Sequence, residues 1–257
     1  EWFLLQRATT IDLSDNGVED RLVIALAESP HAQHLKILDL HDNFVGDKGV
    51  KALAESNSLQ SLTELTLSCI EFGQKGAIAL ANSPVLSNLR KLSLGGNYLG
   101  VEGAVELVTS TNLTHLTTLD LAETNIGDAG LRALAENPSL QHLTELHLSF
   151  NDISDKGAKA LAKSPHLRHL KALTLEGNEI GDEGAKALAE SSTLQHIPIL
   201  NLNQNRIGDL GVCERAESPT LQHLTELHLN HNEIETKGLQ AIAKSQTLRH
   251  LTTLKLQ

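Results

Sequence analysis

The sequence predicts an α/β solenoid, with short parallel strands on a concave face and α-helices on a convex face. Three observations predict this fold. Aliphatic residues two apart recur with a constant 27-residue period without insertion or deletion, an Asn follows most of these pairs, and a Gly- and Ala-rich segment follows the Asn. A fixed period of roughly 20–50 residues is typical of solenoids, because one repeat cannot bury its apolar face alone.

The aliphatic pairs predict the strands, since alternate residues of a strand face opposite sides of a sheet. The pairs are Ile11/Leu13, Leu38/Leu40, Leu65/Leu67, Leu92/Leu94, Leu119/Leu121, Leu146/Leu148, Leu173/Leu175, Leu200/Leu202, Leu227/Leu229 and Leu254/Leu256. We expect one domain over 1–257. It would contain a partial repeat or cap at 1–10, nine full repeats over 11–253, and the start of a tenth at 254–257.

An Asn column predicts the turn that leaves each strand, because an amide side chain can both donate to and accept from the turn backbone. Its members are Asn16, Asn43, Asn97, Asn151, Asn178, Asn205 and Asn232. Ile70 and Thr124 interrupt the column, so we expect the third and fifth repeats to differ locally.

The segment after each Asn predicts a helix. An Asp precedes the Ala/Leu run in six repeats and is interpreted as the N-cap of that helix. The Gly after it is expected to let helix and strand backbones approach closely, and Ser-Pro or Asn-Pro pairs such as Ser29-Pro30 are expected to end the helix. Repeat eight differs: Arg215 occupies a leucine position, which indicates either a tolerated defect with a shifted helix, or a contact site on the convex side or a hinge.

Composition limits the partners. The formal charge is −11 at pH 7, so we expect no nucleic acid, because phosphate-binding proteins usually carry a basic face. No stretch approaches the ~18–20 apolar residues that cross a bilayer, and no membrane partner is expected. Two cysteines, Cys69 and Cys213, do not form a disulfide framework and favour a reducing intracellular compartment.

The two ends of the sequence lead to separate predictions. The chain begins at Glu1 and contains no Met, so we expect an N-terminal segment before it. Trp2–Leu5 is expected to cover the first end of the core. The sequence stops at Gln257 directly after a strand, where a solenoid needs a cap, so more protein or another covering element is expected there.

The repeat, roughly L-x-L-x-x-N-x-I-G-D-x-G-A-x-A-L-A, resembles the leucine-rich repeat family over essentially the whole chain. Its length and its G-A-x-A-L-A segment resemble the ribonuclease-inhibitor-like subclass, and also the Gly-Ala-Leu-Ala repeats of effectors from bacterial pathogens. The resemblance implies a horseshoe with the parallel sheet inside and the helices outside. It does not define the function, because this scaffold hosts many unrelated activities.

The residues that flank the strand leucines differ between repeats and predict a protein-binding concave face. The third and fourth repeats offer small groups there, with a notch at Gly95-Gly96, and Phe44, Tyr98 and Phe150 are the expected aromatic anchors. The alternative is a solvated surface without function. The predicted binding residues are Asp12, Asp15, Asp39, His41, Asp42, Tyr98, Asp120, Glu123, His147, Phe150, Glu176, Asn201, Asn203, His228, Asn230 and His231.

A histidine column precedes the strands and comprises His34, His115, His142, His169, His196, His223 and His250. We interpret these imidazoles as bonding to the loop before the strand, and expect protonation near pH 5–6 to weaken the array. They do not predict a metal site, because ligands must converge on one ion. His228 and His231 are close in sequence but lack a third ligand.

Nucleophile elbow, phosphate loop, H-E-x-x-H and C-x-x-C signatures are all absent from the sequence, which predicts no catalysis, no cofactor and no metal. The leading hypothesis is a monomeric effector-type protein of bacterial origin that acts in a host cytosol or on another bacterial protein. It would bind, and by family analogy inhibit, a protein that presents a basic surface to the Asp12–Asp42 end. Alternatives are a GTPase-activating regulator, or the substrate-recognition part of a ubiquitin-ligase adaptor whose ligase-recruiting segment lies outside this chain.

Overall fold

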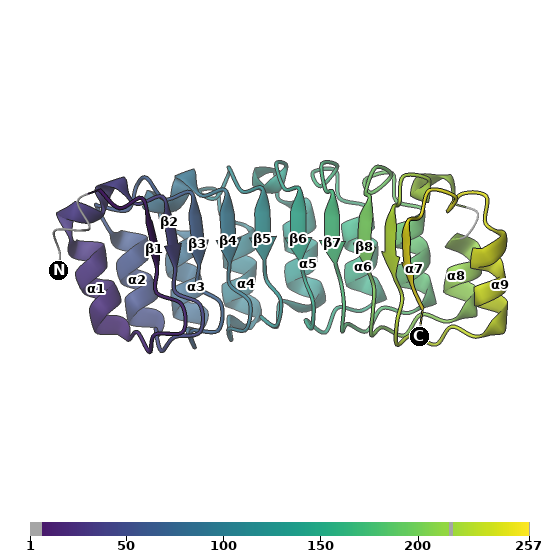
Figure 1. Cartoon of the computed structure of the whole chain (residues 1–257), viewed down its shortest axis with the longest axis horizontal. Coiled ribbons are helices and arrows are strands. Elements are labelled where there is room, and N and C mark those ends of the chain that lie inside the picture. Colours follow the sequence, from purple (N-terminus) through teal and green to yellow (C-terminus); the bar gives the residue numbers. More distant parts are fainter. Residues whose placement is uncertain (1–6, 216–217, 257) are drawn as a thin grey trace. The chain divides into compact units, whose positions relative to one another are not determined.

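The computed structural model describes residues 7–215 and 218–256 and divides the chain into two compact units, 1–125 and 126–257. Figure 1 shows the order of the elements, and each unit is described by itself. The expected packing of Trp2–Leu5 lies outside the described residues, and a single domain over 1–257 stays a prediction.

In the described part of unit 1, each strand except the last is followed by a helix, and the five strands pair in parallel in chain order. The strands are β1 Thr10–Asp12, β2 Ile37–Asp39, β3 Glu64–Thr66, β4 Lys91–Ser93 and β5 Thr118–Asp120. The helices are α1 Asp20–Glu28, α2 Asp47–Glu55, α3 Gln74–Ala81 and α4 Gly100–Val108, with 3₁₀ turns η2 Pro30–His34 and η3 Val85–Asn88.

Unit 2 repeats the arrangement and begins with a helix. Its described helices are α5 Gly127–Glu136, α6 Asp155–Ala162, α7 Asp182–Ala189, α8 Asp209–Arg215 and α9 Thr236–Lys244, with 3₁₀ turns η4 Pro138–Leu140 and η5 Pro219–Leu221. Its described strands are β6 Glu145–His147, β7 Ala172–Thr174, β8 Ile199–Asn201, β9 Glu226–His228 and β10 Thr253–Lys255. They too pair in parallel in chain order.

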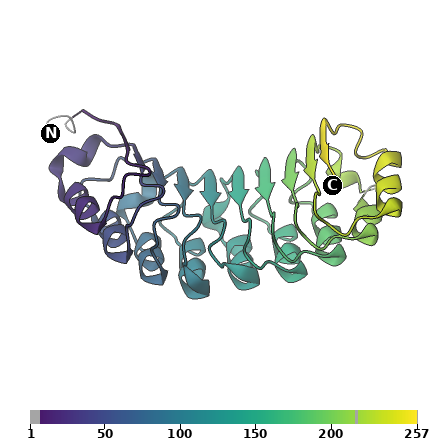
Figure 2. The same ribbon diagram turned by 60° about the horizontal axis from the view of Figure 1, so that its bottom comes forward.

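The register confirms the predicted period. Leu38 pairs with Leu65, and Leu173 pairs with Leu200, so each strand is in register with the equivalent strand of the next repeat. Strands pair about 4.8 Å apart, whereas packed helices need about 8–10 Å. The helix layer of each unit must therefore follow a wider arc than its sheet, and Figure 2 shows the strands on the inner side and the helices on the outer side within each unit.

The core of each unit is aliphatic. Strand leucines such as Leu65 and Leu173 are 1% and 0% exposed, and each helix adds a narrow stripe of small residues. In α7 that stripe is Gly184, Ala185, Leu188 and Ala189. No described helix is long and apolar enough to cross a membrane.

The Asn column bonds the turn after each strand, as predicted, and it also joins neighbouring repeats. Asn178 Oδ1 accepts from the backbone N–H groups of Asn151 and Ile153 in the preceding repeat, at 3.0 Å each. Its Nδ2 donates to the carbonyls of Leu148 and Leu175, at 2.9 Å each. The side chain thus satisfies buried backbone groups in two repeats.

The Asp column has a different role from the one predicted. Asp155 is the first residue of α6 rather than its N-cap, and Ser154 is the N-cap. The Asp155 Oδ1 accepts from the N–H groups of Gly181 and Gly184, both at 2.8 Å, at the start of the next helix, α7. Each such Asp therefore caps the helix of the following repeat, and the N-cap interpretation was wrong about which helix is capped.

The Gly column is a consequence of this capping. A Cβ on Gly184 would lie 2.6 Å from Asp155 Oδ1 and 2.9 Å from Ile180 Cγ2. Gly211 and Gly238 meet Asp182 and Asp209 in the same way, at 2.6 Å. In these three repeats the glycine makes room for the carboxylate of the preceding repeat, and not, as predicted, for helix and strand backbones to approach. Gly130 follows Val101 in the capping column, and the nearest atoms to a Cβ there belong to Ile126.

A serine column makes a third set of links, at the helix ends. Ser191 Oγ donates 2.6 Å to the carbonyl of Ala162, the last residue of the preceding helix. Ser164 donates to Ala135 in the same way, and in unit 1 Ser56 donates to Ala27. The Ser that was predicted to end its own helix also satisfies a carbonyl of the neighbouring one.

The third and fifth repeats, which lack the Asn of the Asn column, differ locally, as predicted. Ile70 is fully buried and makes no side-chain bond to the turn, while Thr124 Oγ1 donates 2.7 Å to the Leu121 carbonyl. Gln74 replaces Asp in the capping column and bonds Glu102 instead. Arg215 ends α8, and its side chain lies outside the described residues.

Candidate functional site

Three rows of side chains on the sheet side of each unit remain outside the core. The strand row is the third residue of each strand, the turn row lies two residues further on, and the left-handed row follows the turn row directly. With one exception, Tyr98, the predicted binding residues fall in these rows.

The strand row holds six predicted residues, Asp12, Asp39, Asp120, His147, Asn201 and His228, which are the last residues of their strands. Several also serve the backbone. Asp39 Oδ1 accepts from the His41 N–H at 2.9 Å, and Asp120 and Asn201 accept in the same way from the residue two positions on. One side-chain oxygen of each of these three residues is therefore used locally.

The turn row contains the predicted residues His41, Glu176, Asn203 and Asn230. The left-handed row contains Asp15, Asp42, Glu123, Phe150 and His231, with φ between 53° and 56°. Cys69 and Gln204 have the same conformation, and the two remaining members are Gly96 and Gly177. Non-glycine residues adopt this conformation at a cost of roughly 1 kcal/mol or more. The row therefore carries side chains at positions where the backbone conformation favours glycine.

In unit 1 the rows are acidic. The pKa of Asp12 is lowered by hydrogen bonds from the Ser14 hydroxyl and N–H. Burial, followed by the negative charges of Asp42, Glu123 and Asp120, raises the pKa of the Cys69 thiol. Cys69 is therefore a protonated thiol in a negative field, which is the opposite of an activated nucleophile.

In unit 2 the rows form a hydrogen-bonded polar surface. Glu176 accepts from Asn201 Nδ2 at 2.8 Å and from Gln204 Nε2 at 3.2 Å. Asn203 Oδ1 accepts from the Asn230 N–H at 2.9 Å. One repeat further towards β6, His147 Nδ1 lies 3.1 Å from Thr174 Oγ1.

Two atoms of this surface have no hydrogen-bond partner among the described residues: His228 Nε2 and Asn230 Oδ1. Both atoms are buried, and the nearest carboxylate oxygen to His228, on Glu226, is 3.9 Å away. Burial, followed by the charge of Lys255, lowers the pKa of His228. The ring is therefore neutral at pH 7.

Phe150 is the aromatic residue of the rows and is 46% exposed. Its ring occupies the space where Gly177 lacks a side chain, since a Cβ there would lie 2.2 Å from Phe150 Cδ1. Gly177 thus supports the ring from the next repeat. One side of the ring is held and the other remains open to a partner.

Tyr98 and Phe44 lie apart from the rows. Tyr98 follows the buried Asn97 and forms a parallel bridge with Gly73, on the segment that leads from the sheet to α4. Tyr98 is 86% and Phe44 64% exposed. Both residues lie on segments that follow the strands of unit 1, outside the three rows. Their role as aromatic anchors for a protein partner stays a prediction.

Sequence reasoning missed one row, the first residue of each strand. In unit 1 it contains Glu64 and Lys91, which are paired in register and form an ion pair at 3.6 Å. Glu145 and Glu226 occupy it in unit 2. The alternation that predicted the strand row applies equally to this position and would have identified it.

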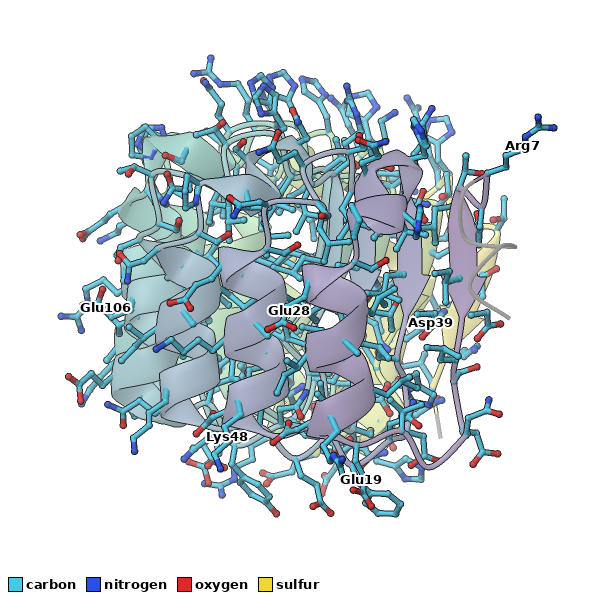
Figure 3. All side chains as sticks on the ribbon, turned by 90° about the vertical axis from the view of Figure 1, so that its left-hand side faces the viewer. Arg7, Glu19, Glu28, Asp39, Lys48 and Glu106 are labelled. Atoms are coloured by element: carbon cyan, nitrogen blue, oxygen red, sulfur yellow. The ribbon has the colours of Figure 1, made fainter. Side chains whose placement is uncertain are left out.

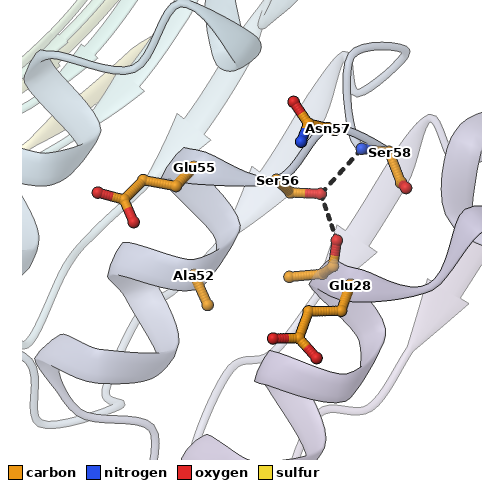
Figure 4. Close-up of a pocket in the computed structure, with 7 residues that line it drawn as sticks. Glu28, Ala52, Glu55, Ser56, Asn57 and Ser58 are labelled. Carbon is orange, nitrogen blue, oxygen red and sulfur yellow. Dashed lines mark hydrogen bonds between the residues drawn. The ribbon is translucent and has the colours of Figure 1, made fainter.

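Two depressions lie outside the rows or at their margin. Figure 4 shows the one between the ends of α1 and α2, about 400 Å³, where Glu28 and Glu55 flank Ser56. The Ser56 hydroxyl at its centre donates to the Ala27 carbonyl and accepts from the Ser58 N–H, so this residue belongs to the serine column. In unit 2 a depression of 530 Å³ is lined by Asn178, Gln204, Asn205, Arg206 and His231 and adjoins the left-handed row.

The described side chains bring together no group of three His, Cys, Asp or Glu with the geometry of a metal site. In the histidine column, His115 Nδ1 lies 3.0 Å from the Ser87 carbonyl, which is the loop contact that was predicted. Cys69 and Cys213 are both free.

Within each unit, a parallel sheet with exposed polar rows is backed by helices, and the Asn, Asp and Ser columns join neighbouring repeats, which defines a solenoid repeat protein. The family model described as Leucine Rich repeat matches residues 31–54, 85–108, 112–135, 139–162, 166–189, 193–212 and 220–243. The chain belongs to the leucine-rich repeat family, and its fold is the predicted leucine-rich repeat solenoid with parallel strands alternating with helices.

Two solved structures from Listeria monocytogenes are similar. Internalin C2 is 23% identical, with 98% of this chain and 82% of that chain covered and a TM-score of 0.53. An internalin, inlF, is 21% identical, with 98% and 83% covered and a TM-score of 0.48. The comparison with curated proteins finds no match. Family and fold support an interaction scaffold.

Proposed function

We propose that this chain is a non-enzymatic scaffold that binds a protein partner through the three rows of its sheet face. The left-handed row carries the proposal. Seven of its nine members are not glycine although all nine have positive φ, and the side chains change from Asp to Cys, Glu, Phe, Gln and His. Structure alone would favour glycine throughout, so the displayed side chains themselves are the reason for the strain.

The two units offer different chemistry. The acidic rows of unit 1, with Asp12, Asp39 and Asp42, favour a basic surface on the partner. The rows of unit 2 offer amides, imidazoles and the half-exposed ring of Phe150, a combination suited to hydrogen bonding around an aromatic anchor. The partner on unit 1 is therefore basic, and the contact on unit 2 is polar with one apolar centre.

A finer assignment follows from the repeat itself. The length of the repeat and the α-helix that follows each described strand from β1 to β9, β5 being followed by α5, support the ribonuclease-inhibitor-like subclass. The Gly-Ala-Leu-Ala sequence of the repeats supports an effector-type protein of bacterial origin. Within that proposal the protein acts in a reducing intracellular compartment, including a host cytosol, and blocks its partner by covering it.

Affinity capture from host and bacterial lysates with paired variants tests the proposal. In unit 1, Asp39→Lys changes the strand row, and Glu106→Lys makes the same charge change on the helix side (Figure 3). In unit 2, Phe150→Ala and His147→Ala change the rows, and Leu210→Ala truncates an apolar residue on α8 that is more exposed than Phe150, at 73% against 46%.

A partner that is lost with the row variants and retained with Glu106→Lys and Leu210→Ala supports binding at the sheet face. A partner that is retained by all row variants refutes it. With the purified partner, Asp39→Lys is expected to slow association at low salt and to have little effect at high salt.

A further inference from the structure

The two edges of the solenoid differ in charge. The entry edge consists of the segments that precede the strands, 29–36, 56–63, 83–90, 110–117, 137–144, 164–171, 191–198, 218–225 and 245–252. These segments contain no Asp or Glu, in a chain with 32 of them. They contain nine of the thirteen histidines: His31, His34, His115, His142, His166, His169, His196, His223 and His250. Figure 3 shows nitrogen-bearing side chains along this edge and labels Arg7 there.

In unit 2 the entry edge is a continuous imidazole row. His142, His169, His196, His223 and His250 are all exposed. The rings of His196 and His223 are 5.1 Å apart between centroids, which is close to the spacing of paired strands. Arg168, Lys171 and Arg249 add fixed positive charge to the same edge.

The exit edge of unit 2, formed by the segments 148–155, 175–182, 202–209 and 229–236, is acidic. It holds eight carboxylates and a single Arg or Lys, Arg206. Asp155, Asp182 and Asp209 are committed to helix capping. The others are Asp152, Glu176, Glu179, Glu233 and Glu235, and of these all except Glu176 are exposed.

Both edges have the same spacing, because the same strands fix them. Asp152, Glu179 and Glu233 occupy one column, one or two repeats apart, and the imidazoles occupy another column with one member in every repeat. Arg206 fills the gap in the acidic column and pairs with Glu179 at 2.6 Å. A second copy of this chain is therefore a partner whose carboxylates match the imidazole row in both charge and spacing.

We propose that the histidine-rich entry edge of unit 2 binds the acidic exit edge of a second copy of this chain when its histidines are protonated. Histidine ordinarily gains its charge between about pH 7 and 5, while carboxylates ordinarily keep theirs down to about pH 4.5. The contact forms in the interval between these limits. At pH 7.5 the chain, with a formal charge of −11, repels its copies and is a monomer.

The charged groups around the imidazole row have both signs, but the negative charges do not cancel the positive charge of the protonated row. Within the edge, Arg168, Lys171 and Arg249 are positive, and His166 is a further imidazole. At the helix ends that pack beside it are Glu136, Lys163, Glu190 and Lys244, and at the strand starts are Glu145 and Glu226. Among the described residues of unit 2, four carboxylates thus face five Lys or Arg and six histidines, and protonation makes the edge positive; Glu217, in the same helix-end column, lies outside the described residues.

The geometry also predicts the form of the assembly. Entry and exit edges are different surfaces, so one copy can bind two others and the contact does not close on itself. Mass is then expected to grow with protein concentration beyond a dimer. Simple loss of net charge near the isoelectric point of 5.6 would not depend on which histidines are present.

Sedimentation equilibrium at pH 7.5 and 5.8, in 50 and 500 mM salt, tests the proposal with two triple variants. The edge variant is His169→Asn/His196→Asn/His223→Asn. Asn is native to this column, since Asn88 occupies it and donates 2.9 Å to the Gln60 carbonyl. The control variant is His41→Asn/His147→Asn/His228→Asn, which removes the same number of histidines from the sheet rows and none from either edge of unit 2. Circular dichroism verifies folding of both.

We expect the wild type and the control variant to associate at pH 5.8 in low salt, and the edge variant to associate about tenfold or more weakly, given three lost charge pairs. A monomeric wild type at pH 5.8 overturns the proposal, as does equal association of the two variants. A wild type that stays monomeric but binds heparin at pH 5.8 through the edge overturns it in favour of a polyanion.

Discussion

Capping of each helix by the preceding repeat can be tested with Asp155→Ala. The carboxylate accepts two N–H groups at the start of α7, both at 2.8 Å. Each hydrogen bond to a charged group contributes about 1.5 kcal/mol, at the lower end of the usual range because the site is part-buried. The interaction of Asp155 with the start of its own helix adds about 0.5 kcal/mol. The sum is a loss of about 3–4 kcal/mol in the free energy of unfolding.

Urea unfolding followed by far-UV circular dichroism measures this loss. Glu183→Ala is the matched control, because it also removes an acid from the first turn of a helix in unit 2. Its exposed ion pair with Lys159, at 3.1 Å, is expected to contribute less than about 1 kcal/mol. If Asp155→Ala destabilises no more than Glu183→Ala, capping by the preceding repeat does not stabilise the array and the reasoning fails.

A double-mutant cycle isolates the contact itself. Gly184→Ala places a methyl group 2.6 Å from the position of Asp155 Oδ1, so its cost should fall when Asp155 is already Ala. We expect a coupling of about 1 kcal/mol. The remaining penalty comes from Ile180, 2.9 Å from the same methyl group. Additive effects would show that the glycine is required for another reason.

Three further stability predictions can be checked by the same unfolding measurement. Asn178→Ala should cost about 4 kcal/mol, because it removes the acceptor of the buried Asn151 and Ile153 N–H groups and one donor from the Leu148 and Leu175 carbonyls, and a cost below about 1 kcal/mol would contradict the Asn column. Gly177→Ala should cost about 1–2 kcal/mol from its φ of 67° and the clash with the Phe150 ring, and the cost should be lower in a Phe150→Ala background. Burial and Lys255 lower the pKa of His228, and a base whose pKa is lower in the folded state loses stability as pH falls below its unfolded value. His228→Asn should therefore reduce the decrease in stability between pH 7.5 and 5.5, and an unchanged pH dependence would exclude this role.

The repeat period and its consequences could be predicted from sequence because they depend on periodicity alone. Pairs such as Leu65/Leu67 predict both the strand and which side chains are buried. The Asn column could be predicted for the same reason, since an Asn next to a turn has few other roles. Most of the candidate site follows, because the residues between buried leucines must face out.

The helix caps could not be predicted, because sequence shows what an Asp precedes and not what it reaches. Asp155 lies next to its own helix in sequence, yet its carboxylate reaches Gly181 in the following repeat. The left-handed row was hidden for a similar reason. Only Gly96 and Gly177 indicate positive φ by residue type, while Phe150 or Glu123 in the same conformation gives no such signal.

The division into two units was also absent from the prediction, since the 27-residue period continues without change through residue 125. The surrounding columns do change. Thr124 replaces the Asn, and Val101 replaces the Asp of the capping column and is 49% exposed. These interruptions do not identify the division by themselves, because Ile70 and Gln74 interrupt the same two columns in the third repeat.

Binding of a partner at the exposed rows of the sheet face can be tested by site-specific photo-cross-linking. A photoreactive phenylalanine analogue at Thr174, in the middle of the unit 2 strand row, is compared with the same residue at Lys156, on the outer side of α6. With the captured partner present, we expect a cross-link from position 174 and none from position 156. A cross-link from 156 with none from 174 would show that the partner binds the helices, and the central claim would be wrong.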